Sequence, residues 1–329
     1  MKPSGFWQGK RVLVGGGGGF LGSYLVPQLV EAGAEVTVLD NLDNGDVENL
    51  APVAGKIRFV QADLRDLNAC EEHTRGQAVV MNLAAKAFGM EYSRAHNGEM
   101  LVYNLLCTLG LLEAARQNGV NRFLVVSSSC VYPDDAPIPT PELDVFTRRP
   151  ESVNEGYGWA KRIQELAATY YSRDYGMAMT IVRPFNMYGA NYRWPSREKA
   201  HVIPILVKRV MDGEDPLVVW GSGQQRRNFL HGSDAASLTM RLVEKGVVGM
   251  PVNLGYEDDV SIADLVALIC EVVGWRPRIV FDTSKPEGHF RKCSDATRLR
   301  AVTDGYTPKV PLRDGLAEMR AWYKRSFGK

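Results

Sequence analysis

The chain has 329 residues, of which 45% are hydrophobic and 23% charged, and its formal net charge is +1 at pH 7. This composition supplies enough apolar material for a folded core, which excludes a disordered, collagen-like or disulfide-stapled protein. The near-neutral charge argues against nucleic acid or an anionic membrane as the main partner, because both select a basic surface. The five cysteines are scattered and form no CxxC pair, and no apolar run reaches the roughly 18 residues of a membrane span. We therefore expect a cytoplasmic protein with reduced thiols and no metal site.

The first half of the chain alternates short apolar strands with helical stretches, a pattern typical of βαβ units and a parallel sheet. The expected strands are residues 11–14, 35–39, 57–60, 79–83, 123–127 and 179–183. The clearest helices are 99–118 and 157–174. We predict an α/β fold, in which residues 1–185 form a Rossmann-type doubly wound parallel sheet.

The helix expected at 99–118 is apolar on nearly all sides. A helix without a polar face is buried on both sides, either inside the fold or against a second subunit.

After about residue 185, prolines and glycines separate shorter elements, and two further helices are expected to begin near Ser261 and Leu312. This change predicts that residues 186–329 form mainly a smaller, mixed α/β substrate-binding lobe. A segment near 229–256 is expected to return to the first domain.

A glycine-rich turn joins the first strand to the first helix. Gly16, Gly19 and Gly22 keep the spacing GxxGxxG, and Phe20 and Leu21 complete the turn. Such glycines allow a tight turn, let a pyrophosphate approach the backbone and pack the helix on the strand, while the helix N-terminus offers N–H groups to phosphate. A glycine-rich loop alone is also compatible with a plain flexible turn.

Asp40 ends the second strand, about 20 residues after the glycines, where a carboxylate binds the ribose hydroxyls of NAD. Asn41 and further acidic residues follow it, with no Arg or Lys nearby. A 2′-phosphate would meet uncompensated negative charge there, so NAD is favoured over NADP. Asp63 and Leu64, after the third strand, fit an adenine contact, although a helix N-cap by Asp63 is an equally good interpretation.

Tyr157 and Lys161 lie four residues apart and therefore on one helix face. An ammonium group near a phenol lowers the phenol's pKa, which suits the phenol to take a proton from a sugar hydroxyl as hydride leaves. Three serines at 127–129 precede this pair at the end of a strand.

These motifs stand in the order found in the extended short-chain dehydrogenase/reductase family, and the chain resembles its nucleotide-sugar epimerases and dehydratases. The resemblance covers essentially the whole chain and rests on GGGGGFLG, NLAA, SSSCVYP, YGWAK and RPFNMYG. It departs at Asn82, where the family often has His.

The resemblance implies a hydride-transfer triad of Ser128, Tyr157 and Lys161, in which Lys161 also holds the NAD ribose. It further implies a homodimer formed through a four-helix bundle. The implied cofactor-lining residues after the fourth strand are Leu83, Ala84 and Ala85.

Two residues beyond Ser128 the subfamilies diverge. Dehydratases have Asp-Glu at this point, whereas this chain has Ser129 and Cys130, so no acid is present to protonate a leaving hydroxyl. Oxidation of C4 to a ketone makes the protons on C3 and C5 acidic, and their exchange needs two proton carriers. Cys130 is one candidate, and Lys199 or His201 is the other. Plainer interpretations are a buried apolar cysteine, a phosphate-binding lysine and a helix-capping histidine.

Two branches of the family compete. AAKAFGM, MLVYN and REKA resemble GDP-mannose 3,5-epimerase, which pairs the cysteine with that lysine. HVIP, VWGSG and KPEG resemble GDP-L-fucose synthase, which pairs the cysteine with that histidine, ends in a net reduction and prefers NADPH. Because Asp40 points to a retained NAD, we favour a redox-neutral epimerase; the epimerase–reductase and a simple 4-epimerase stay open.

The resemblance also implies which residues bind the substrate, a nucleotide-diphosphate sugar and, on the competing branches, a GDP-hexose. Arg227 matches a diphosphate-binding arginine, whose planar fork suits phosphate oxygens. Asn186 fits a diphosphate or sugar contact. Lys285 and Arg291 fit the nucleotide end.

Overall fold

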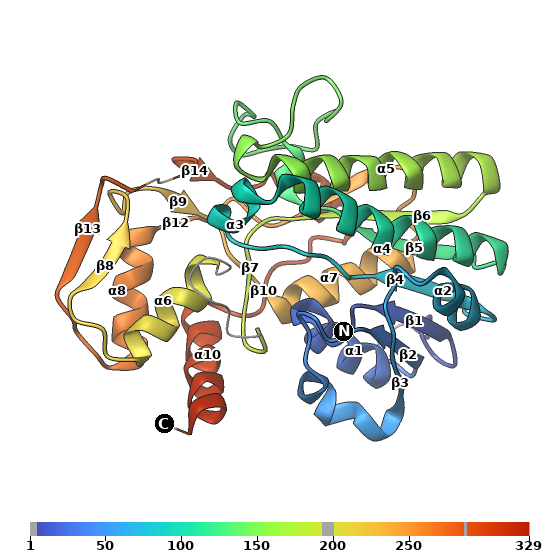
Figure 1. Cartoon of the computed structure of the whole chain (residues 1–329), viewed down its shortest axis with the longest axis horizontal. Coiled ribbons are helices and arrows are strands. Elements are labelled where there is room, and N and C mark those ends of the chain that lie inside the picture. The colour runs from blue at the N-terminus through green and yellow to red at the C-terminus, as the bar shows by residue number, and fades with distance from the viewer. Residues whose placement is uncertain (1–4, 193–200, 286–287, 329) are drawn as a thin grey trace.

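A seven-stranded parallel sheet organises the larger part of the molecule (Figure 1). The computed structural model describes residues 5–192, 201–285 and 288–328. Across the sheet the strands follow the order β11-β6-β5-β4-β1-β2-β3. The strands are β1 (Arg11–Gly15), β2 (Glu35–Asp40), β3 (Ile57–Gln61), β4 (Val79–Asn82), β5 (Arg122–Val126), β6 (Ala178–Pro184) and β11 (Pro251–Leu254). The predicted α/β class and doubly wound sheet are confirmed.

The chain order reverses where β1 meets β4. In doubly wound sheets, ligands bind beyond the carboxyl ends of the strands at such a reversal. The interior positions of β1 and β4 are buried, as in parallel strands covered on both faces. This burial explains why the six expected strands were visible as short apolar runs and why their ends shift by only a residue.

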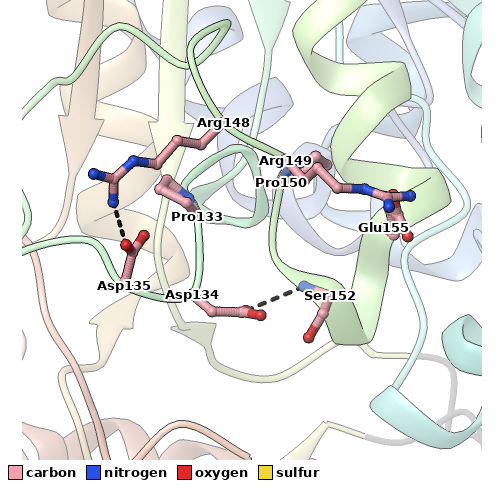
Figure 2. Close-up of a pocket in the computed structure, with 8 residues that line it drawn as sticks. All are labelled: Pro133, Asp134, Asp135, Arg148, Arg149, Pro150, Ser152 and Glu155. Atoms are coloured by element: carbon pink, nitrogen blue, oxygen red, sulfur yellow. Dashed lines mark hydrogen bonds and ion pairs between the residues drawn. The ribbon is translucent and has the colours of Figure 1, made fainter.

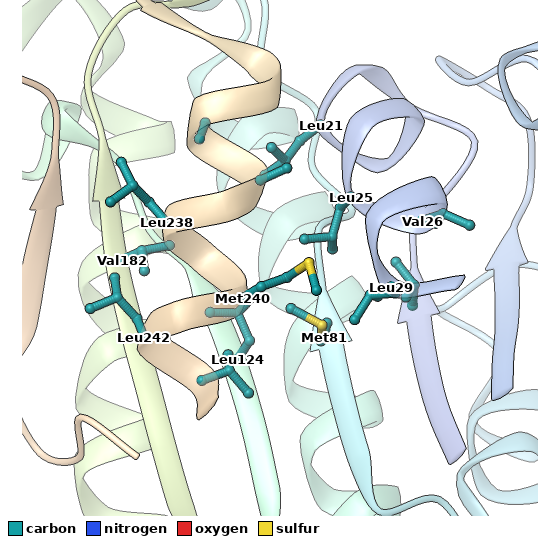
Figure 3. Packing of buried hydrophobic residues seen from close by; sticks show 14 of the residues in the cluster. Leu21, Leu25, Val26, Leu29, Met81, Leu124, Val182, Leu238, Met240 and Leu242 are labelled. Atoms are coloured by element: carbon teal, nitrogen blue, oxygen red, sulfur yellow. The ribbon is translucent and has the colours of Figure 1, made fainter. Parts of the chain in front are cut away.

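Helices cover both faces of the sheet. On one face lie α1 (Phe20–Glu31) and α7 (Gly232–Lys245), and on the other lie α2 (Leu67–Thr74), α4 (Asn97–Gln117) and α5 (Glu155–Tyr175). Figure 3 shows how leucines of α1 and α7 meet apolar side chains of β4, β5 and β6. The labelled side chains include Leu21, Leu25, Leu29, Leu238, Leu242, Met81, Leu124 and Val182.

The helix α4 is not buried all round. It packs against α5, α2 and the sheet, yet Val102 and Leu106 are 54% and 52% exposed, and Leu109 belongs to the same stripe. Of the two explanations for its apolar sequence, burial inside the chain is therefore wrong for this stripe. Within the described residues, α4 is also the one helix whose length and composition would suit a membrane span.

A smaller group of elements packs around its own apolar cluster, at the left of Figure 1. It contains α6 (Val202–Met211), β8 (Leu217–Trp220), α8 (Ile262–Val273), β13 (Ile279–Asp282) and α10 (Leu312–Phe327). Ser261 caps α8 by accepting a hydrogen bond from the Asp264 N–H at 3.0 Å. Residues 232–254 supply α7 and β11 to the main sheet.

The remaining elements are short. They are η1 (Val47–Lys56), α3 (Met90–Ala95), η2 (Ser129–Val131), η3 (Ser152–Asn154), β7 (Met187–Tyr188), β9 (Arg226–Arg227), β10 (Leu230–His231), β12 (Val260–Ser261), β14 (Arg291–Lys292) and α9 (Thr297–Val302). Among them β14 pairs with β9, which joins the late loop to the middle of the chain.

Candidate active site

The glycine-rich turn lies at the reversal point between β1 and β4. Gly16 has φ +74°, and a Cβ there would lie 2.6 Å from the backbone of Ala84. A Cβ on Gly22 would lie 2.2 Å from the carbonyl oxygen of Gly17. Both positions therefore require glycine. Gly19 is the N-cap of α1 and has no side chain to satisfy the first N–H groups of the helix, which suits a phosphate at this end.

The other residues of this turn have structural contacts of their own. Phe20 stacks on Tyr192 with ring centroids 4.1 Å apart, and Leu21 is buried in the core. Leu83 donates its N–H to the Gly15 carbonyl at 2.8 Å. Ala84 and Ala85 follow it as half-buried residues beyond β4. Of these residues, Ala84 lies directly against the turn at Gly16.

Asp40 is buried and accepts two backbone N–H groups, from Gly18 at 2.9 Å and from Leu42 at 2.8 Å. Burial raises the pKa of this carboxyl, and the two hydrogen bonds lower it. The carboxylate thus lies directly beside the glycine turn, as a ribose-binding acid requires.

Asn41 is linked to Asp63, whose Oδ2 accepts from its amide at 3.0 Å. Asp63 also holds Arg65, with Nη2 and Oδ2 2.7 Å apart, so the pKa of this carboxyl is held far below its usual range. Sequence reasoning missed Arg65, because only the fold links its guanidinium, through Asp63, to Asn41. The Asp63 carboxylate already neutralises the positive charge of Arg65.

One interpretation for this region, a helix N-cap by Asp63, is wrong. The residue that caps α2 is Asp66, which accepts the N–H of Asn68 at 2.9 Å; Asp63 instead accepts the N–H of Arg65 in a turn before the helix. The Leu64 side chain is 4% exposed and packs in the core, and the adenine contact of Asp63 and Leu64 stays a prediction.

Ser128 and Tyr157 meet at the carboxyl end of β5. The Ser128 hydroxyl hydrogen-bonds the Tyr157 phenol and accepts the Cys130 N–H at 3.1 Å. Of the neighbouring serines, Ser127 is instead bonded to the buried Glu165. Ser128 is thus the serine that shares contacts with both Tyr157 and Cys130.

Lys161 lies one turn after Tyr157 on α5, with Nζ 5.4 Å from the centre of the phenol ring. It donates to the Val126 carbonyl at 2.8 Å and to Gln164 Oε1 at 3.1 Å. Burial lowers the pKa of Lys161 to about 8. Burial likewise raises the pKa of Tyr157, so the expected acidic phenol is wrong for this arrangement, since desolvation dominates and the ammonium is engaged elsewhere.

Cys130 is half-buried, whereas the other four cysteines are buried. Its thiol hydrogen-bonds the Glu151 carboxylate, and burial together with this negative charge raises the thiol's pKa to about 12. Glu151 also contacts Lys292, with Nζ and Oε1 3.0 Å apart, and His289, with Nε2 and Oε1 3.1 Å apart. Sequence reasoning missed these three residues, because no local motif connects them with Cys130.

His201 precedes α6 at the N-cap position, and its side chain makes no capping hydrogen bond. It hydrogen-bonds the Ala87 backbone, and burial lowers its pKa, which favours the neutral ring. Its ring centroid lies 6.2 Å from that of Tyr192. Lys199 lies outside the described residues.

The expected substrate-binding residues are dispersed. Arg227 is half-buried on β9 and lies within electrostatic range of Glu151 and Lys292. The Nδ2 of Asn186 lies 3.5 Å from the Oδ1 of Asn228.

Arg291 and Lys285 lie in the late loop. Arg291 forms an ion pair with Asp259, which also binds Arg226. Lys285 is exposed, with Nζ 5.9 Å from the ring centre of Trp220. The structure therefore brings Arg227 toward the group formed by Cys130, Glu151, Lys292 and His289, hereafter the cysteine cluster, whereas Arg291 is held by a carboxylate.

A cavity of about 350 Å³ borders the cysteine cluster on its outer side (Figure 2). Asp134 in its wall accepts the Ser152 N–H at 3.1 Å and lies 3.3 Å from His289 Nε2. Two ion pairs also line the cavity, Arg148 with Asp135 and Arg149 with Glu155. Neither Ser128 nor Tyr157 lines this cavity.

Residues 12–255 match the NAD dependent epimerase/dehydratase family. The chain belongs to this family. It is 32% identical to GDP-L-fucose synthase 1 of Arabidopsis thaliana over 96% of this chain and 94% of that protein. It is also 31% identical to a dTDP-4-dehydro-6-deoxy-D-allose reductase of a Streptomyces species over 97% of both chains.

Solved structures agree with this assignment. A UDP-glucose 4-epimerase with UDP-glucose from Thermotoga maritima matches with TM-score 0.85 and 28% identity, over 96% of this chain and 99% of that one. The dTDP-glucose 4,6-dehydratase DesIV from Streptomyces venezuelae, with NAD and TYD bound, matches with TM-score 0.83 and 30% identity, over 97% and 98%. The predicted family is confirmed, and the chain is an enzyme of that family.

Proposed function

We propose that this enzyme is an NAD-dependent nucleotide-sugar epimerase that oxidises a hexose at C4, inverts C3, C5 or both, and reduces C4 again. The contact of Ser128 with both Tyr157 and Cys130 carries the proposal, because it joins a group for C4 chemistry to a proton carrier for the adjacent carbons.

Ser128, Tyr157 and Lys161 have different roles in the oxidation of C4. The Ser128 hydroxyl hydrogen-bonds the C4 oxygen, and the Tyr157 phenol takes the proton of the C4 hydroxyl. The Lys161 ammonium favours the phenolate once the substrate fills the site. When bound, NAD would supply the hydride acceptor and donor for C4.

Inversion next to C4 follows from the acidity that the ketone gives the adjacent C–H bonds. The Cys130 thiol exchanges a proton with one face of the ring carbon. The partner on the opposite face is His201, whose ring is neutral near pH 7, or Lys199. Dehydration is not part of the proposal, since neither position after Ser128 provides an acid for a leaving hydroxyl.

NAD is proposed over NADP because Asp40 lies where a 2′-phosphate would approach. The glycine turn would hold the pyrophosphate, and Asp40 would accept the ribose hydroxyls. The turn fits a dinucleotide, since a Cβ at Gly16 or Gly22 would collide with backbone.

A nucleotide-diphosphate sugar is the proposed substrate class, and a GDP-hexose is the proposed member. Arg227 offers a guanidinium fork near the cysteine cluster, and the named relatives act on GDP-, dTDP- or UDP-linked sugars.

We also propose a homodimer in which α4 and α5 of two subunits form a four-helix bundle. The exposed apolar stripe of α4 and the exposed Ile163 and Tyr170 of α5 supply the surface. The free thiols agree with the proposed cytoplasmic location. Light scattering that finds a monomer would contradict the dimer.

A second candidate is an epimerase–reductase that consumes a reduced cofactor. The relatives named GDP-L-fucose synthase favour it, and Arg65 near Asn41 offers a positive charge that Asp63 would have to release for NADPH.

The deciding experiment incubates the protein with GDP-mannose, GDP-4-keto-6-deoxymannose and dTDP-4-keto-6-deoxyglucose in heavy water. Deuterium at C3 or C5 by NMR, with no net change in the absorbance of the reduced nicotinamide, is the expected result. Stoichiometric loss of that absorbance would instead establish the reductase. Product without label would establish a simple 4-epimerase.

A further inference from the structure

Glu151 is a buried carboxylate that the hydride-transfer triad does not use. Its side chain is 7% exposed, and its oxygens contact Lys292 at 3.0 Å, His289 at 3.1 Å and Asn154 at 2.9 Å. Carboxylates are seldom buried this fully unless they are paired, and the Lys292 ammonium supplies the opposite charge here. These partners hold the pKa of Glu151 well below its usual range despite its burial.

The fourth partner of Glu151 is the Cys130 thiol. The backbone fixes the two residues to each other, since the Glu151 N–H donates to the Cys130 carbonyl at 3.2 Å. The thiol therefore gives its proton to the carboxylate in a hydrogen bond. This orientation makes Cys130 a thiol, and not a thiolate, in the resting enzyme.

The outer end of the cluster reaches solvent. The His289 side chain is 24% exposed, and its Nε2 also lies 3.3 Å from Asp134, which lines the cavity of Figure 2. The charged groups facing Glu151 are Lys292, His289 and Arg227. A line of hydrogen-bonding groups thus runs from the thiol through Glu151 and His289 to Asp134 in the wall of the cavity.

We propose that Glu151 and His289 form a proton relay that restores the proton of Cys130 from solvent in each turnover. This proposal rests on the proposed function, because it assigns a role to Cys130 in inversion. Glu151 does not touch the sugar; it is a positioning residue that acts through the thiol.

The proton balance is simple. The thiol gives its proton to the carbanion face of the ring carbon and becomes a thiolate, while the base on the opposite face has already taken one proton. The His289 ring then passes a proton to Glu151, and Glu151 passes one to the thiolate. His289 recovers its proton from water in the cavity, and the base releases one, so no net charge or electron is transferred.

The first test measures how fast iodoacetamide alkylates Cys130 in the NAD-loaded protein at pH 7, with mass spectrometry to locate the label. Glu151→Gln removes the negative charge but leaves Lys292 and Arg227, so the thiol becomes more acidic and alkylation becomes about three- to fourfold faster for each lost pKa unit, because the larger thiolate fraction outweighs the lower nucleophilicity. Glu155→Gln, a carboxylate near in sequence that pairs with Arg149, is the matched control and should leave the rate unchanged. An unchanged or slower rate in Glu151→Gln overturns the proposal.

The second test uses turnover in heavy water with a sugar that the wild type labels. Glu151→Gln and His289→Gln should lose at least tenfold in deuterium incorporation next to C4 while retaining C4 oxidation, seen as nicotinamide absorbance. In the His289→Ala variant, imidazole in the buffer should restore the incorporation of deuterium next to C4. A merely structural role would lower both activities together and give no rescue, and that result overturns the relay.

The two proposals can fail separately. If the wild type labels no sugar, the proposed function is wrong, and the alkylation comparison still decides whether Glu151 controls the thiol. If Glu151→Gln unfolds, as thermal unfolding would show, His289→Gln at its half-exposed position decides between relay and structure.

Discussion

The buried ion pair behind the serine segment allows a stability prediction with a definite size. Arg183 and Glu165 form two hydrogen bonds, Nε to Oε1 at 2.9 Å and Nη2 to Oε2 at 2.6 Å, and their side chains are 3% and 6% exposed. Glu165→Gln leaves the guanidinium buried without a counter-charge. We expect the free energy of unfolding to fall by about 3–5 kcal/mol.

The assay is urea unfolding followed by far-UV circular dichroism, extrapolated to zero denaturant. Glu71→Gln is the control, because its partner Arg75 lies on the same helix surface and both side chains are at least half exposed. This control should cost less than about 1 kcal/mol. The double variant Glu165→Met with Arg183→Met removes both charges and should cost less than the two single losses combined. A Glu165→Gln loss no larger than the control would refute the reasoning.

Three further predictions concern the cofactor turn and the lysine of the triad. Gly16→Ala should weaken NAD binding at least tenfold by calorimetry while Gly55→Ala, where nothing lies within 4 Å of an added Cβ, should not; equal affinities would contradict the steric argument. Asp40→Ala should weaken the affinity for NAD by about 10–100-fold, the value of hydrogen bonds to a charged group, and should reduce the preference for NAD over NADP. The control is Asp43→Ala, because Asp43 is exposed. Lys161 has its pKa lowered to about 8 in the folded state, so the unfolded chain binds the additional proton between pH 8 and 10.5. The ligand-free wild type should therefore gain stability relative to Lys161→Met as pH rises through this window, by about 3 kcal/mol in all, and a difference that does not change with pH in urea unfolding would contradict this.

The sheet could be predicted because parallel strands buried on both faces are short apolar runs in any context. The expected strand at 35–39 and the observed β2 differ only by Asp40, which is polar because it faces the cofactor turn. The i, i+4 pair of Tyr157 and Lys161 could equally be predicted from the sequence, since helix periodicity alone places both on one face.

The electrostatics of the same pair could not be predicted from spacing. The expectation of an acidic phenol assumed that the ammonium lies free beside it, whereas Lys161 is engaged by Val126 and Gln164 and the phenol is desolvated. Spacing reports which side chains share a face, but a pKa depends on burial and on every neighbour from other elements.

The Glu151 cluster shows the same limit more strongly. Lys292 and Glu151 are 141 positions apart and meet because β14 pairs with β9, which brings the late loop over the end of β5. In the sequence, Glu151 reads as a polar residue before a helix, and Cys130 as a lone thiol next to a serine. Only the folded structure brings the two side chains together as a hydrogen-bonded thiol and carboxylate. A search for proton carriers along the chain therefore finds the cysteine that we propose to meet the sugar, whereas the groups that contact its thiol become visible only where distant parts of the chain come together.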